Sequence, residues 1–323
     1  MWGPQSREEW IETAGLAVAA GALYASGFFA LVFLLPLEAL SRRRGFPSLL
    51  WGVAIAVLAI ALIDVVRISR LTAGLGSSWL LVWNWSLPLG LLAALALADA
   101  PIPGVRRALY RLLLGWGAAM LVTLPLFLKV VTDGSLMAFL EGQFSALTGA
   151  ASGSESARSA AETAVGIVAG TYGPGILIML VLNWYLGSAL AHRFSTGVAP
   201  PPSLARFAMP AEGVWAVIGG VGGIVLSLIV DLGAIQAIFW NIALISLMLY
   251  AAQGLAIGRH LLEYYQLSPG IRLMILLGVL VLLFVPGINL VVLLGLPGLG
   301  VSELWIDYNR FERSAKEDES HSE

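Results

Sequence analysis

The chain of 323 residues is 59% hydrophobic and only 12% charged, and its formal net charge is −2. A soluble domain has about 25% charged residues, so this chain lacks the polar side chains needed to cover a water-exposed globule. Most of its outer surface must face lipid, and we therefore expect an all-α, polytopic transmembrane helical bundle. Cysteine is absent, which excludes disulfides, thiolate catalysis and thiolate metal sites.

The first apolar segment, residues 13–40, follows an acidic N-terminus that lacks the basic region of a signal peptide. We therefore expect this segment to stay in the mature protein. It is long enough to cross a membrane once with some tilt. Gly27 and Pro36 can also break it, and the alternative is a tight pair of half-helices.

Eight further apolar segments follow, and several of them are short or interrupted by proline and glycine. We expect a kink at Pro125, a break at 173–175 and a turn at 286–287. With the first segment the count is about nine spans, within a range of eight to ten. The eight segments lie at 49–66, 78–99, 108–131, 160–194, 213–230, 234–258, 271–286 and 288–305.

Residues 132–162 form the one extended polar region. Apolar residues recur in it at helical spacing, which predicts a short amphipathic helix on the outer membrane surface, followed by a flexible linker at 149–156. We expect residues 1–313 to form a single integral membrane domain and residues 314–323 to be a disordered cytoplasmic tail. The apolar residues of the amphipathic helix are Leu136, Phe139, Leu140, Phe144 and Leu147.

The basic residues predict the orientation, because cytoplasmic loops are enriched in arginine and lysine. Thirteen basic residues fall on one side of the predicted spans, against four on the other, with Arg7 undecided. We therefore expect a bacterial inner-membrane protein whose C-terminus is cytoplasmic. The thirteen are Arg42, Arg43, Arg44, Arg106, Arg107, Arg111, Arg193, Arg206, Arg259, Arg272, Arg310, Arg313 and Lys316; the four are Arg67, Arg70, Lys129 and Arg158.

Polar residues at lipid depth are candidates for function because burying them is costly. The Trp83-Asn84-Trp85 run predicts either an aromatic pocket around an amide or an interfacial tryptophan belt. Asn183, Asn241 and Gln253 lie within apolar segments. They either line a solute cavity or form hydrogen bonds between helices.

Two further groups of residues are candidates for packing or docking. Ala17, Gly21 and Ala25 lie four residues apart and form a small-residue strip, which favours close helix contact. Near the C-terminus, an acidic and aromatic group predicts a structural clamp on the cytoplasmic side, and a partner-docking site is the alternative. This group consists of Glu303, Trp305, Asp307 and Arg310.

The C-terminal sequence Gly300-Val-Ser-Glu-Leu-Trp-Ile-Asp-Tyr308 resembles the ending of the YybS-like bacterial membrane proteins, a family of unknown function. Members typically finish Gly-Leu-x-Asp-x-Trp-x-Asp-Phe-Arg, so Glu303, Tyr308 and Asn309 depart from the pattern. The segment LMLYAAQGLAI around Gln253, the break at Pro286, the loop at 206–210 and Asn183 also look like that family. The resemblance covers roughly 160–313.

The resemblance implies an architecture distantly similar to the membrane-embedded substrate-binding (S) components of energy-coupling-factor transporters. Such proteins bind a solute and dock on partner subunits through small-residue faces, which the strip at Ala17, Gly21 and Ala25 would suit. The expected surroundings are the lipid bilayer, with membrane-protein partners and a small solute. Nucleic acid, a metal and a cofactor are not expected.

No zincin pair, Ser-His-Asp order, phosphate loop or dinucleotide fingerprint is present in the sequence, so a non-enzymatic role is expected. The leading hypothesis is a protein that binds or helps to move a small solute. The first rival is a membrane scaffold that recruits partners without any solute, and an intramembrane enzyme comes third.

Overall fold

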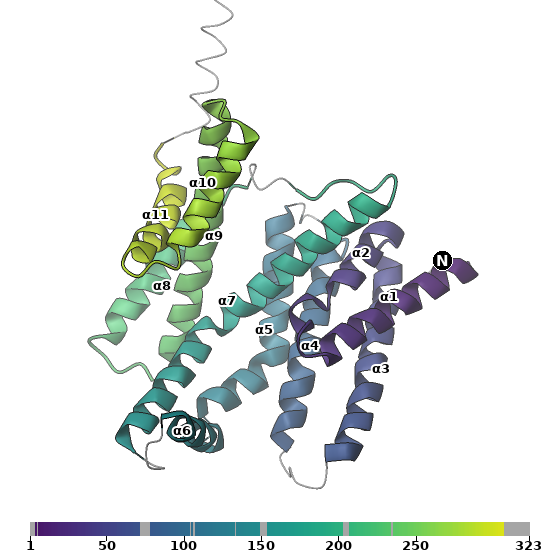
Figure 1. Cartoon of the computed structure of the whole chain (residues 1–323), viewed down its shortest axis with the longest axis horizontal. Helices are drawn as coiled ribbons and strands as arrows, with labels where there is room; N and C mark the ends of the chain where they lie inside the picture. Colours follow the sequence, from purple (N-terminus) through teal and green to yellow (C-terminus); the bar gives the residue numbers. More distant parts are fainter. Residues whose placement is uncertain are drawn as a thin grey trace, which may run out of the picture. The chain divides into compact units, whose positions relative to one another are not determined.

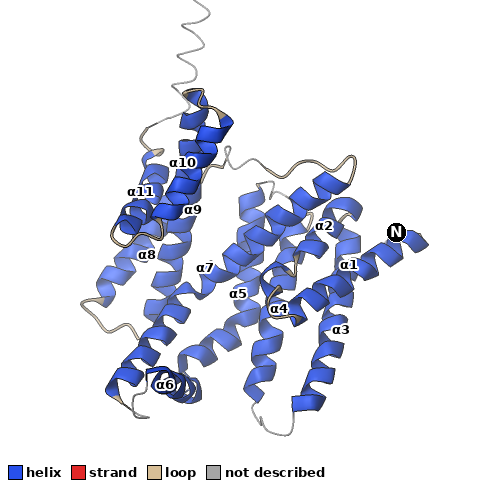
Figure 2. Ribbon diagram, viewed as in Figure 1, coloured by secondary structure: helices blue, strands red, loops and turns tan. Residues whose placement is uncertain are grey.

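The structure is a computed structural model, and it describes residues 4, 6–71, 78–103, 105, 107–132, 134–148, 154–202, 207–233 and 235–306. All regular elements within these residues are helices (Figures 1 and 2). The prediction of an all-α fold is therefore confirmed. The chain divides into two compact units, Met1–Pro201 and Pro202–Glu323, which are described separately. The prediction of one membrane domain over 1–313 stays a prediction, and the tail at 314–323 lies outside the described residues.

The described residues of the first unit form seven α-helices. Its core is formed by the contacts of α4 with α5, of α1 with α3, and of α7 with both α2 and α5. The buried side chains of this core are mostly leucine and alanine, and the alanines allow the helices to approach closely. The elements are α1 (Arg7–Ala25), a 3-10 turn η1 (Ala30–Val32), α2 (Leu35–Arg44), α3 (Phe46–Leu71), α4 (Ser78–Asp99), α5 (Ala108–Thr132), α6 (Gly134–Thr148) and α7 (Glu155–Phe194).

The predicted first span is a pair of short helices, as the alternative expected. The backbone of Gly27 takes a φ of +72°, which glycine adopts without steric cost. Pro36 lies in the first turn of α2, where its missing N–H has no helical partner to lose. The end of α2 returns to the start of α1, since Arg43 Nη1 lies 2.6 Å from Glu12 Oε1. The two helices thus form a hairpin.

The helix α7 is the longest element of the first unit. Its 40 residues correspond to about 60 Å at 1.5 Å per residue, roughly twice the thickness of the hydrocarbon core of a bilayer. It contacts α6 near its beginning and α2 near its end (Figure 1). The predicted break at 173–175 is wrong, because α7 continues through Pro174.

The second unit is built around α9. A glycine pair brings α11 against it: a Cβ at Gly254 would lie 2.0 Å from the carbonyl oxygen of Leu296, and one at Gly300 would lie 2.0 Å from that of Tyr250. The predicted turn at 286–287 is confirmed, with a φ of +86° at Gly287. The elements are η3 (Ala211–Gly213), α8 (Val214–Ser227), α9 (Ile235–Tyr264), α10 (Pro269–Leu282) and α11 (Ile288–Ser302).

Four of the described helices are long and apolar enough to cross a membrane, and four shorter apolar helices accompany them. Nine spans are therefore not confirmed. The region 132–162 contains a helix, α6, and its predicted position on the outer membrane surface stays a prediction. Residues 149–153 of the predicted linker lie outside the described part of the chain. The long candidates are Phe46–Val66, Ala108–Leu128, Glu155–Phe194 and Ile235–Tyr264, and the shorter ones are Trp85–Asp99, Ala211–Ser227, Pro269–Val279 and Ile288–Ser302.

Candidate functional site

Charged side chains from three helices meet inside the first unit, in what we call the Glu38 cluster. Glu38 and Arg42 come from α2, Asp99 is the last residue of α4, and α7 contributes Trp184 and Ser188. Glu38 is fully buried, and the other carboxylate, Asp99, has only 6% of its side chain exposed. Buried charges are costly in a protein interior, so this cluster is the strongest candidate for a functional site.

The carboxylate of Glu38 is held by two donors on the same oxygen. Arg42 Nε donates to Oε1 at 2.6 Å, one helical turn along α2, which is the spacing at which ion pairs form on a helix. The hydroxyl of Ser188 donates to the same atom at 2.9 Å from α7. Gly187 permits this approach, because a Cβ there would lie 2.6 Å from Glu38 Cβ.

Arg42 connects the three helices of the cluster. Its Nη2 atom lies 3.4 Å from Asp99 Oδ1. Its guanidinium carbon lies 5.0 Å from the centre of the Trp184 ring, within the distance at which a cation is attracted to an aromatic face. Arginine suits this position because its planar group can bind two carboxylates and stack on a ring at the same time.

The cluster contains more acidic side chains than basic ones. Two carboxylates share one guanidinium, and a second oxygen on each of them, Glu38 Oε2 and Asp99 Oδ2, is buried without a hydrogen-bond donor. Glu38 lies in α2, which is not one of the candidate spans. Burial and then the neighbouring charge of Asp99 raise the pKa of Glu38 from 4.5 to about 8. The neutral form of this carboxyl group is therefore favoured at neutral pH.

The next arginines of α2 bind acids of α1 instead. Arg44 Nη2 lies 2.7 Å from Glu12 Oε2 and its Nη1 lies 3.5 Å from Glu9 Oε1, while Arg43 also contacts Glu12. These pairs are partly exposed, and such pairs contribute little to stability. They fix the hairpin and leave Arg42 as the cation that serves the Glu38 cluster.

Of the predicted solute-lining residues, three have described side chains that bind polar groups of the protein. Asn183 is fully buried in α7, and its Nδ2 donates to the carbonyl oxygens of Leu31 and Met179, both at 2.7 Å. Asn241 Nδ2 donates to Ala237 O at 2.7 Å within α9. Asn183 belongs to the first unit and Asn241 to the second.

Gln253 connects three segments of the second unit. Its Oε1 accepts a hydrogen bond from the backbone N–H of Met209 at 2.8 Å, and its Nε2 donates to Glu303 Oε2. It lies twelve residues from Asn241, or about 18 Å along α9. The structure therefore does not bring Asn241 and Gln253 together. Hydrogen bonding within and between segments accounts for both side chains.

The tryptophan run is only partly described. Trp83 and Asn84 lie in α4, but their side chains are outside the described part of the structure. The side chain of Trp85 is half-buried. Whether the run lines a pocket or forms an interfacial belt stays a prediction.

The small-residue strip of α1 packs inside the first unit. Ala17, Gly21 and Ala25 are buried, and a Cβ at Gly21 would lie 2.8 Å from Ala59 Cβ on α3. The close contact that the strip predicts is thus made with α3, and a partner would reach this face only after α3 moved.

In the C-terminal group, Glu303 binds Gln253 and Trp305 is 77% exposed. Asp307 and Arg310 lie outside the described residues.

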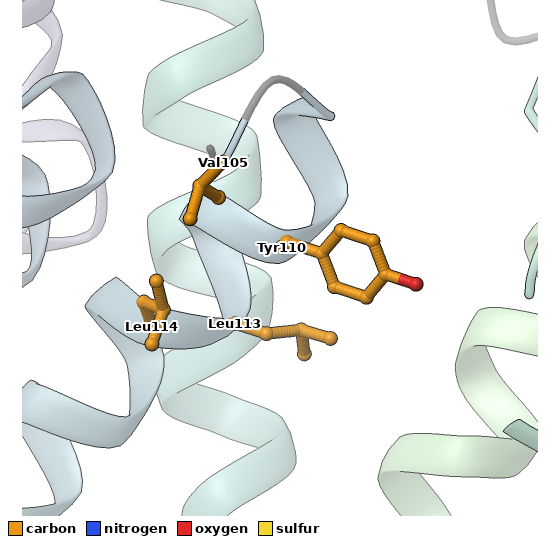
Figure 3. A pocket seen from close by; sticks show the side chains of 4 residues that line it. All are labelled: Val105, Tyr110, Leu113 and Leu114. Atoms are coloured by element: carbon orange, nitrogen blue, oxygen red, sulfur yellow. The ribbon is translucent and has the colours of Figure 1, made fainter. Parts of the chain in front are cut away.

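A shallow apolar depression of about 370 Å³ lies at the start of α5. It is lined by Val105, Tyr110, Leu113 and Leu114 (Figure 3). None of the residues predicted to line a solute site contributes to it. Its lining is apolar except for the hydroxyl of Tyr110, so it lacks the convergent polar groups that orient a ligand.

One feature of the sequence pointed to the Glu38 cluster, namely the spacing of Glu38 and Arg42. Glu38 and Arg42 are four residues apart at the end of an apolar segment, the spacing of a helical ion pair. Asp99 and Ser188 lie 57 or more residues away from them, and no local pattern joins them to the pair. The contact of α2 with α7 is what creates the cluster.

Comparison with known proteins supports the resemblance but gives no function. No curated protein and no solved structure matches the chain, so the similarity to S components has no support from a comparison. A family model described as a predicted membrane protein, DUF2232, matches residues 143–297. This range covers 155 of 323 residues, from α6 into α11, and it ends before Gly300. The predicted resemblance to the YybS-like membrane proteins is therefore confirmed over residues 143–297.

Proposed function

We propose that this chain is a multi-pass protein of the bacterial inner membrane that binds or helps to move a small solute through the Glu38 cluster, without catalysing a reaction. The single observation that carries the proposal is the burial of the Glu38 and Asp99 carboxylates beside the half-buried guanidinium of Arg42 within a helical bundle. Helix packing alone does not require these charges, because apolar residues of similar volume are often equally stable or better. Ionisable groups inside membrane proteins typically serve solute or ion pathways.

The chemistry of the cluster limits the solute. Its two carboxylates favour a ligand that carries a cationic or hydrogen-bond-donating group. The guanidinium of Arg42, stacked on Trp184, can in addition orient a carboxylate or phosphate group. A mode of action like that of an S component, with docking on partner subunits and a cytoplasmic C-terminus, is part of the same proposal.

The test is to purify the full chain in lipid nanodiscs and identify retained small molecules by mass spectrometry. Each molecule is then titrated while the unfolding temperature is measured. We expect at least one to stabilise the protein, because a ligand at 100 times its Kd contributes about 2.7 kcal/mol. The shift should be absent in Arg42→Gln and kept in Arg158→Gln, which alters an exposed ion pair on α7.

A membrane scaffold is the second candidate function. The observation that favours it is that Asn183, Asn241 and Gln253 all have partners within the protein, as expected for side chains that hold helices together. Repeated purification of an empty protein, with no compound that raises its unfolding temperature, would contradict solute binding and favour the scaffold.

A further inference from the structure

Two features of the Glu38 cluster have no explanation if both of its carboxylates are ionised. Glu38 Oε2 and Asp99 Oδ2 are buried and no donor reaches them. Ordinary folded proteins satisfy nearly all such buried polar atoms. In addition, two negative charges would share the single positive charge of Arg42 in a water-poor environment, where an uncompensated charge is costly.

The groups around Glu38 can be assigned for each neighbouring element. Among the described residues, the charges that act on it are those of Asp99, from α4, and Arg42, from α2 itself. The helix α7 presents the hydroxyl of Ser188 and the ring of Trp184. Two acids of α1, Glu9 and Glu12, are paired with Arg43 and Arg44. The 3-10 turn η1 (Ala30–Val32) is apolar.

The carboxyl groups of Glu38 and Asp99 both contact Arg42, and the presence of Asp99 raises the pKa of Glu38. Two neighbouring carboxyl groups can form a hydrogen bond with each other only if one of them carries a proton, because an ionised carboxylate only accepts. One proton on Glu38 Oε2 would turn this unpaired acceptor into a hydrogen-bond donor. It would also leave one negative charge opposite one positive charge.

We propose that Glu38 and Asp99 hold a single proton between them, and that the cluster is thus a proton-binding site. The site is closely packed on the side where α7 meets α2, since a methyl group added at Gly187 would already lie 2.6 Å from Glu38 Cβ and Cγ. Release of the proton to water leaves an unpaired buried carboxylate, which then attracts a cationic group. The proton and a cationic solute therefore compete for the same oxygens. Binding of the solute is linked to release of the proton.

This inference rests on the proposed function only for its link to a solute, and proton binding can be measured alone. The experiment records infrared difference spectra of the full chain in nanodiscs while the pH is raised from neutral to alkaline. A protonated carboxyl group has a C=O stretching band that disappears on ionisation. We expect this band at neutral pH in the unaltered protein and its loss at alkaline pH.

Two variants and one control identify the groups. Glu38→Gln should lack the band, since the amide replaces the protonated acid. In Asp99→Asn the carboxyl group of Glu38 should ionise at a lower pH, because it is then the one carboxylate opposite Arg42. If Glu38 does not share its proton with Asp99, the pH at which the band is half lost should be the same in Asp99→Asn as in the unaltered protein. Glu162→Gln, which alters a half-exposed acid paired with Arg158, should leave the band and its midpoint unchanged.

The inference is overturned if the unaltered protein lacks the band at neutral pH. This measurement needs no variant, so it can be made even if a variant fails to fold. An unchanged midpoint in Asp99→Asn, or persistence of the band in Glu38→Gln, contradicts the shared proton equally. Solute retention is measured independently. If the band is present and no solute stabilises the protein, the proposed function is refuted and the proton site is upheld. If a solute stabilises the protein and the band is absent, the proton site is refuted and the proposed function is upheld.

Discussion

Gly187 of α7 lies directly against the side chain of Glu38 of α2. A Cβ at position 187 would lie 2.6 Å from both Cβ and Cγ of Glu38 and 3.0 Å from the carbonyl oxygen of Leu35. These are atoms close to the backbone, and they cannot move aside without shifting the helix. The absence of a side chain at Gly187 therefore allows α2 and α7 to close around the buried charges.

The first prediction is that Gly187→Ala destabilises the protein. Overpacking a tight contact typically costs about 1–3 kcal/mol, and here it also moves Glu38 away from Ser188. Gly166→Ala and Gly175→Ala on the same helix meet nothing within 4 Å and should be neutral or stabilising, because alanine is the better helix former. Thermal unfolding of the three variants in one lipid preparation measures the difference. Equal unfolding temperatures would show that α2 and α7 do not pack as described.

The second prediction concerns pH. Burial raises the pKa of Glu38 from 4.5 to about 8, so the folded protein binds this proton more tightly than the unfolded chain. The resulting stability is fully present below about 4.5 and is lost as the pH rises through about 8, by about 1.4 kcal/mol per pH unit within this window.

Unfolding temperatures measured between about pH 5 and about pH 9 should therefore fall in the unaltered protein. The slope should be smaller in Glu38→Gln, which imitates the protonated acid at every pH. Glu162→Gln should keep the slope of the unaltered protein, because its exposed pair with Arg158 contributes little. A slope that Glu38→Gln leaves unchanged would assign the pH dependence to other groups.

The third prediction concerns the glycine contact of the second unit. Gly254→Ala and Gly300→Ala should separate α9 from α11, because each added methyl group would lie 2.0 Å from a backbone carbonyl oxygen of the facing helix. Gly258→Ala on α9 and Gly295→Ala on α11 meet nothing within 4 Å and are the matched controls.

The separation can be read from hydrogen exchange in α9 and α11 near the two glycines. We expect faster exchange around Gln253 in the first two variants, since its bond to Glu303 depends on the contact. Similar exchange rates in all four variants would contradict the close contact between α9 and α11.

The fourth prediction places the N-terminus on the cytoplasmic side. The contacts of Arg43 and Arg44 with Glu12 put the start of α1 beside the basic end of α2, and basic segments stay in the cytoplasm. Single cysteines at Glu8, Thr196 and Glu155 are informative because the natural chain has no cysteine.

An impermeant thiol reagent added to intact cells should label Glu155→Cys alone. Glu8→Cys and Thr196→Cys should react only after the membrane is permeabilised. Labelling of Glu8→Cys in intact cells would mean that the start of α1 does not lie on the cytoplasmic side.

Local residue signals predicted the hairpins but not the contacts between them. Gly27 with Pro36, and Pro286 with Gly287, act on their own backbone, so their turns can be read from the sequence. Pro174 was misread because its effect depends on neighbours. The carbonyl group that loses its helical donor at Pro174 is that of Gly170. The helix α5 packs along this stretch, where Trp116 Nε1 donates to the carbonyl oxygen of Gly173 at 3.0 Å, and neighbouring helices help membrane helices to continue through proline.

The candidate site was predictable only in part. Polar residues of the apolar segments such as Asn183 and Gln253 are indeed buried, but each has one partner that is a backbone group far away in the chain, at Leu31 and Met209 respectively. Such partners leave no trace in side-chain spacing. Glu38 and Asp99 lie 61 positions apart in the sequence, and only the packing of the first unit joins them.

The unbroken length of α7 has one mechanical consequence. The exposed pair of Arg158 and Glu162 stands near one end of the same rod whose other end supplies Ser188 to Glu38. The 26 residues from Glu162 to Ser188 correspond to about 39 Å of continuous helix. Because the helix is unbroken, a single element sets the spacing between the exposed ion pair and the hydroxyl that binds the buried carboxylate.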